Sequence, residues 1–105
     1  MIKARYTADG NKHTLSIRGH ANYGEYGKDI VCAGVSAIVQ ALMGWVENNP
    51  HTAECVTIDD RTGEIIIACE GGEDVSAVFQ MTTIGLEQIS RAYPDHSLYI
   101  SEFAE

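Results

Sequence analysis

A histidine and a cysteine separated by a short glycine-containing segment could together carry nucleophilic chemistry. They are His20 and Cys32, within residues 19–32 (GHANYGEYGKDIVC), where the first ends a predicted strand and the second opens a predicted helix. The thiolate is the reactive form of cysteine, and a neighbouring imidazole can protonate a leaving amine. The pair is therefore a candidate catalytic dyad for thiol-dependent hydrolysis.

The predicted helix start suits a reactive thiol. Asp29 is the expected N-cap residue, because of its type and its place before the apolar stripe. Cys32 then falls in the first turn, where unpaired backbone N–H groups and the positive end of the helix dipole stabilise a thiolate or an oxyanion. At 3.6 residues per turn, Cys32 lies at the edge of the apolar arc and Ser36 lies one turn on, nearer the polar side.

Structural roles compete with this interpretation, since cysteine is among the most buried residue types and the spacing of a single His–Cys pair has little specificity. Cys69 is in phase with Ile65 and Ile67, so we interpret it as a core residue, and Cys55 at a strand start as structural. The remaining histidines are interpreted as turn or surface residues: His13, His51 and His96.

The segment between His20 and Cys32 alternates glycines with aromatic residues. Tyr23, Gly24, Tyr26 and Gly27 suit a mobile cover whose rings close over a bound peptide. An ordinary exposed turn with two surface tyrosines is equally compatible with the pattern.

A metal site and a phosphate-binding loop fit the sequence less well. His20 and Cys32 with a further cysteine lack the close spacing of zinc ligands. Residues 24–29 (GEYGKD) are too short for a phosphate-binding loop and place Asp29 where serine or threonine should meet magnesium. We therefore predict no metal and no cofactor.

The elements that must position these residues follow from hydrophobic periodicity. The pattern predicts strands over 2–8, 13–19, 55–58, 64–69 and 97–101, and helices over 29–48 and about 75–93, the latter closed by Pro94. The fold class is α+β, in the order ββαββαβ, with two helices on a mostly antiparallel sheet and a single domain over residues 1–105.

Charge and cysteine content narrow the functional classes. Seven Lys and Arg against fifteen Asp and Glu give a net charge of −8, which disfavours direct nucleic-acid binding and favours a basic partner. Three cysteines without a C-x-x-C pair, and an N-terminus without a signal peptide, predict reduced thiols in the cytoplasm. The longest apolar stretches are interrupted by polar residues, so we expect no membrane-spanning segment.

At the His–Cys segment the sequence resembles the ribosomal-processing cysteine protease family, also called YsxB-like. The family pattern is G-H-A, a glycine-containing loop, then G-x-D-x-x-C-A-x-V-S-A, and it stands here as residues 19–21 (GHA) and 27–37 (GKDIVCAGVSA). Length and element order also fit, so the resemblance extends over nearly the whole chain. One departure is Gly34, where relatives more usually carry alanine; helical glycine costs up to about 1 kcal/mol and could loosen the support under Cys32.

The resemblance implies that His20 is the catalytic histidine, Cys32 the nucleophile, and Asp29 and Ser36 supporting residues. The implied activity is removal of an N-terminal extension from a basic ribosomal protein precursor, that of large-subunit protein twenty-seven. It also implies a homodimer whose loop becomes ordered on substrate binding. The rival hypothesis is a non-catalytic acidic module that holds a basic ribosomal protein through its surface and the Tyr23–Tyr26 loop.

Overall fold

The computed structural model describes residues 1–19, 29–59 and 61–104. Its elements follow the predicted order ββαββαβ, which confirms two helices packed on one sheet in a single domain. The predicted boundaries hold to within a few residues, and a short 3₁₀ turn over Pro50–Thr52 is added between helix and strand. The helices and strands are β1 (Ile2–Asp9), β2 (Lys12–Arg18), α1 (Ile30–Asn48), β3 (Ala53–Asp59), β4 (Glu64–Glu70), α2 (Glu73–Ala92) and β5 (Ser97–Ala104).

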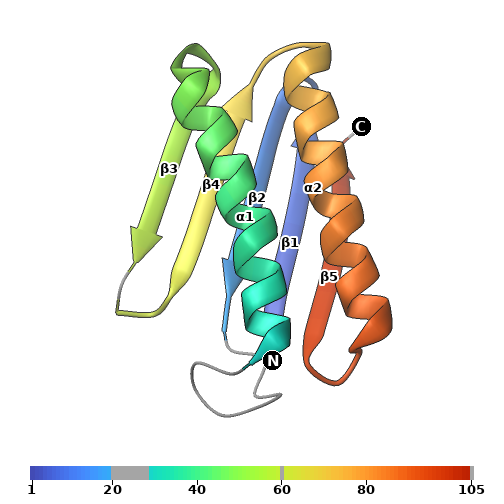
Figure 1. The fold of residues 1–105 in the computed structure, drawn as a ribbon. Coiled ribbons are helices and arrows are strands. Elements are labelled where there is room, and N and C mark those ends of the chain that lie inside the picture. The colour runs from blue at the N-terminus through green and yellow to red at the C-terminus, as the bar shows by residue number, and fades with distance from the viewer. Residues whose placement is uncertain (20–28, 60, 105) are drawn as a thin grey trace.

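The five strands form one mixed sheet in the order β3-β4-β2-β1-β5. Every neighbouring pair is antiparallel except β1 and β5, which run parallel. Both helices lie on one face of this sheet, and the other face is open (Figure 1). The parallel pair follows from α2, which carries the chain back along the sheet before β5 begins.

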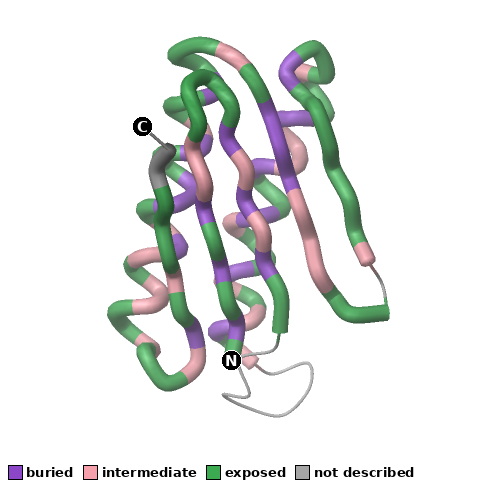
Figure 2. Tube along the Cα trace, turned by 180° about the vertical axis from the view of Figure 1, so that it is seen from behind, coloured by how far each residue is buried: buried purple, intermediate pink, exposed green. Residues whose placement is uncertain are grey.

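The core lies between the sheet and the helices. In β1 the alternation is plain, because Ile2, Ala4 and Tyr6 are buried while Lys3 and Arg5 are exposed on the open face. Figure 2 shows the same alternation along the central strands, whereas β3 is exposed along nearly its whole length. The helices complete the core with apolar residues that are almost fully buried: Val31, Val35, Val39, Leu42 and Val46 from α1, and Val75, Phe79 and Leu86 from α2.

Two glycines lie where α1 and α2 pack side by side. A Cβ added at Gly34 would lie 3.4 Å from Ile89 Cδ1, and one at Gly85 would lie 3.0 Å from Ile38 Cδ1. Gly34 therefore sits on the flank of α1 that faces α2. Cys32 lies on another side of the helix, so the expected effect of Gly34 on it would act through the helix backbone and not through a side-chain contact.

By length and composition α1 is apolar enough to cross a membrane, with a mean hydropathy of 1.7, so the expected interruptions do not break this stretch. Its apolar arc instead packs on the sheet and on α2, as in the core helix of a globular domain. The helix is therefore accounted for by packing within the domain.

The assignment of His13 to the surface was wrong. Its side chain is only 7% exposed and its Nδ1 lies 2.6 Å from the hydroxyl of Tyr6. The imidazole also stacks with the Tyr6 ring and packs against Phe79. Alternation with Leu15 and Ile17 places it on the buried face, and the tyrosine hydroxyl makes that burial tolerable for a polar ring.

Candidate active site

Asp29 is the N-cap of α1, as predicted. Its backbone is extended, and its Oδ1 accepts hydrogen bonds from the amides of Val31 at 2.9 Å and Cys32 at 3.0 Å. Its carbonyl oxygen accepts from the amide of Ala33 at 3.0 Å. A side-chain cap of this kind typically contributes about 1 kcal/mol, and here it fixes the turn that carries the candidate nucleophile.

This capping changes the expected oxyanion site. Asp29 accepts hydrogen bonds from the amides of three of the first four helical residues, Val31, Cys32 and Ala33. The amide of Ile30 is the exception. An oxyanion held by the amide of Cys32 itself would require Asp29 to release it. The carboxylate also offsets part of the positive dipole end, so a thiolate at Cys32 depends more on a nearby cation such as an imidazolium.

Cys32 is half-buried against the core, and Ile30 beside it is 56% exposed. Ser36, one turn along, is exposed. At 100° per residue, Cys32 and Ser36 share the flank of α1 opposite to Gly34 and Ile38, which face α2. The thiol is therefore placed on the side of α1 toward β4 and β3, where a substrate could reach it.

Gly19 ends the segment that leads to the candidate base. Its φ is +95°, a conformation that L side chains rarely adopt, and an added Cβ would overlap the carbonyl oxygen of Met1. Only glycine lets β2 leave the sheet this close to the N-terminal residue. From the sequence, Gly19 was identified only as part of the G-H-A motif. Its place at the end of a predicted strand was the sign that the backbone there needs glycine.

A hollow of about 470 Å³ opens beside Gly19 rather than beside the thiol. Its lining mixes charges of both signs, from Lys3 and Arg18 on one side and Asp59 and Glu64 on the other. The mixture gives the hollow no clear preference for an anion or a cation.

The other predicted loop residues, His20, Tyr23, Gly24, Tyr26 and Gly27, lie outside the described residues, so the distance between His20 and Cys32 is not part of this geometry. The described ranges hold no group of three or more His, Cys, Asp or Glu side chains able to bind a metal. The residues that the structure does bring together are Asp29 and Cys32.

Comparison with known proteins decides the family. The model of the family described as cysteine protease Prp matches residues 1–98. The chain belongs to the Prp family of cysteine proteases. As a member of it, the protein is a peptide-bond hydrolase that uses a thiol.

Two curated Prp proteins and two solved structures illustrate the relationship. The ribosomal processing cysteine protease Prp of Staphylococcus aureus is 30% identical over 94 residues, 84% of this chain and 85% of that protein. The Prp protein of Mycoplasma genitalium is 30% identical over 95 residues, 90% of this chain and 94% of the relative.

Among structures, S. aureus Prp in complex with a covalently linked product peptide has a TM-score of 0.83 at 25% identity, covering 99% and 100% of the two chains. The SMU.848 protein of Streptococcus mutans shares the fold, with a TM-score of 0.79 at 23% identity and coverage of 99% and 96%.

Proposed function

We propose that this Prp protein removes the N-terminal extension of large-subunit ribosomal protein twenty-seven. The observation that carries the proposal is a capped, half-buried and accessible cysteine at a helix start, in a chain of the Prp family. Relatives named ribosomal processing proteases, and a relative that holds a product peptide covalently, support the same chemistry. The net charge of −8 suits a basic precursor and disfavours direct nucleic-acid binding.

In the proposed reaction the thiolate of Cys32 attacks the carbonyl carbon of the scissile peptide bond. The C–N bond breaks as the His20 imidazolium gives its proton to the departing amine, leaving a thioester on Cys32. His20 then takes a proton from water, whose oxygen attacks the thioester and releases the carboxylate and the thiol. The backbone amide of Ile30 is the proposed oxyanion donor from the helix start.

Two further residues hold this site in place in the proposal. Asp29 sets the orientation of the first turn through its bonds to Val31 and Cys32. Ser36, exposed one turn beyond Cys32 on the same flank, keeps its predicted supporting role toward substrate or loop. Tyr23 and Tyr26, with Gly24 and Gly27, are proposed to cover the bound peptide.

We also propose a cytoplasmic homodimer of residues 1–105. All three cysteines are free thiols, and thiols stay reduced in the cytoplasm. Sedimentation of the purified protein over a range of concentrations tests the assembly, and a single monomeric species throughout would refute it.

The test of the activity is incubation of the host's precursor with wild type, Cys32→Ala and Cys55→Ala, followed by intact-mass measurement. Cys55 is exposed and distant in sequence from the helix start, so its variant controls for loss of any thiol. The proposal predicts one N-terminal cut by wild type and Cys55→Ala and none by Cys32→Ala. A cut by Cys32→Ala would refute the assignment, and salt-sensitive binding without any cut would favour the acidic binding module.

A further inference from the structure

The side of the helical layer that faces away from the sheet carries no charge over most of its length. No Asp, Glu, Lys or Arg occurs in residues 30–46 of α1 or in residues 75–86 of α2. The charged residues of the two helices lie near the helix ends: Glu47, Glu73, Asp74, Glu87 and Arg91. A surface helix normally carries charged and polar residues on its solvent side, so this surface departs from the usual pattern.

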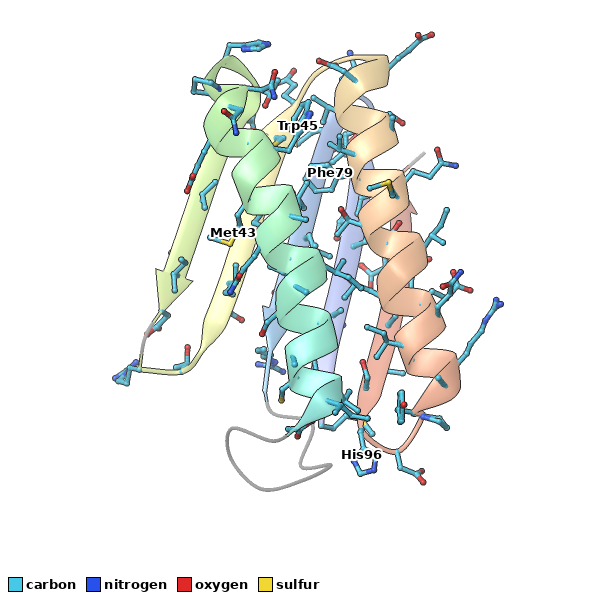
Figure 3. The ribbon with its side chains drawn as sticks, viewed as in Figure 1. Met43, Trp45, Phe79 and His96 are labelled. Atoms are coloured by element: carbon cyan, nitrogen blue, oxygen red, sulfur yellow. The ribbon has the colours of Figure 1, made fainter. Side chains whose placement is uncertain are left out.

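Apolar side chains occupy this outer surface. Met81 is 75% exposed and Ile84 is 48% exposed, and both share one side of α2 with the exposed Ala77. On α1, exposed alanines recur every four residues and also share one side, opposite the buried valines. The aromatic residues Trp45 and Phe79 lie instead between the two helices (Figure 3). We give the name helical face to the surface of six exposed residues: Ala33, Ala37, Ala41, Ala77, Met81 and Ile84.

The helical face is large enough to bind another protein. Helices of 19 and 20 residues are each about 30 Å long, and packed neighbours lie about 10 Å apart. Their joint outer surface is therefore about 600 Å² per copy, and a contact between two such surfaces buries about 1,200 Å². This area is at the lower end of the range for stable interfaces. An apolar centre with charged residues around it is also the usual anatomy of an interface.

The charge of the chain favours a second copy as the occupant. Each copy carries −8, so two copies repel one another unless they meet through surfaces without charge. A two-fold contact places a surface against the same surface of the partner, so a patch of one sign would oppose itself. The helical face avoids this repulsion, and its alanines let the helices of two copies approach closely. A basic partner would find no carboxylates on residues 30–46 or 75–86.

We propose that two copies of this chain pair through the helical face, with α1 and α2 of one protomer against those of its partner and the two sheets outside. The inference rests on the homodimer proposed above and names the surface that forms it. Cys32 and Ser36 lie outside the helical face, on the flank of α1 toward β3. Pairing therefore leaves the thiol of each protomer open to substrate.

Sedimentation equilibrium gives the dissociation constant of the pair for wild type and for variants with added carboxylates. Met81→Glu/Ile84→Glu should raise Kd by at least about a hundredfold, because pairing would bury charges without partners. Ala37→Glu should weaken the pair from the α1 side for the same reason. Leu98→Glu/Ile100→Glu is the matched control, since it adds the same charge at aliphatic residues 38% and 37% exposed on the open face of the sheet.

Two further measurements accompany this comparison. Urea unfolding checks that the variants on the helices are folded, which we expect because glutamate is a good helix former and these positions are exposed. Added salt should lower the Kd of wild type, because it screens the repulsion between two acidic copies.

Each result decides the proposal. Dissociation of the folded helical variants, with the β5 variant still paired, supports it. A pair that survives both sets of substitutions on the helical face, or that is lost only in the β5 variant, overturns it and leaves the homodimer in place. A pair weakened by salt also overturns it, because opposite charges would then form the contact. A wild type that stays monomeric at every concentration overturns the homodimer as well, whereas the intact-mass test decides cleavage separately.

Discussion

The domain holds a histidine or cysteine of interest near each end of the sheet, and the two ends give these residues opposite environments. Toward one end His13 and Cys69 are cross-strand partners in the core, beneath the start of α2 (Figure 1). Burial lowers the pKa of the His13 imidazole and raises the pKa of the Cys69 thiol. Both side chains are therefore held neutral and inert.

At the other end Cys32 is half-buried at a capped helix start, on a flank that solvent can reach. The comparison shows that a histidine and a cysteine do not form a reactive pair merely because they lie close together. What differs is access to solvent and the presence of groups that stabilise charge, and those depend on where each strand or helix ends.

Among the substitutions that leave both proposed reacting groups in place, Gly19→Ala gives the largest expected effect on activity. Positive φ and the clash with the carbonyl of Met1 should force the backbone to shift just before His20, with a loss of kcat/KM on the order of a hundredfold. Gly10→Ala is the control, because Gly10 also has positive φ, at +59°, but open space around it and a place at the other end of β2. Steady-state kinetics measure both. Equal losses of kcat/KM in the two variants would show that backbone strain at a glycine of positive φ causes the effect, and not the clash with Met1.

Alanine substitutions at Cys69 and Cys32 should separate an effect on stability from an effect on activity. Cys69→Ala leaves a cavity in the core and should lower the free energy of unfolding by about 1–2 kcal/mol with kcat/KM unchanged. Cys32→Ala should abolish cleavage and lower the unfolding free energy by less than about 1 kcal/mol, because its side chain is only half-buried. Urea unfolding and kinetics on both proteins check this. Loss of activity in folded Cys69→Ala would contradict the division.

Stability should fall in acid because of His13. Its pKa is lowered from 6.5 in the folded protein, so the unfolded chain takes up the proton more readily. The contribution of His13 to stability is therefore fully present above the unfolded value of 6.5 and is lost as pH falls below it.

The measurement for His13 is unfolding by urea at neutral pH and at about pH 5.5, for wild type and His13→Gln. The variant should show a smaller difference between the two conditions, because glutamine cannot titrate. His51→Gln, at an exposed residue of the 3₁₀ turn, should behave like wild type. An identical pH dependence in wild type and His13→Gln would show that other groups cause the loss.

The smallest predicted effect is at Gly34. Alanine there gains helix propensity, and its Cβ would meet Ile89 Cδ1 at ordinary contact distance, so stability should rise by up to about 1 kcal/mol. Thermal unfolding measures this. A lower midpoint temperature would mean that the α1–α2 contact tolerates no added methyl group.

The sequence predicted the elements well because their signals are local. In β1 the alternation of apolar and polar residues predicts one buried face, and in α1 the apolar stripe does the same. Asp29, just before that stripe, predicts the N-cap. His13 is in phase with Leu15 and Ile17, but it was misassigned because the partners that make its burial tolerable, Tyr6 and Phe79, lie a strand away and a helix away. The hydrogen bond from the Cys32 amide to Asp29 was also missed, because residue type predicts a cap but not which amides its side chain accepts from.

The most direct test is the rate at which iodoacetamide labels each cysteine near neutral pH, followed by mass spectrometry of the digested protein. Cys55 is exposed, Cys32 half-buried and Cys69 buried, so accessibility alone would make Cys55 the fastest. A thiol activated for catalysis reverses the first two, and we predict that Cys32 is labelled well ahead of Cys55, with Cys69 slowest. Labelling of Cys55 at the same rate as Cys32, or faster, would contradict the assignment of Cys32 as the nucleophile.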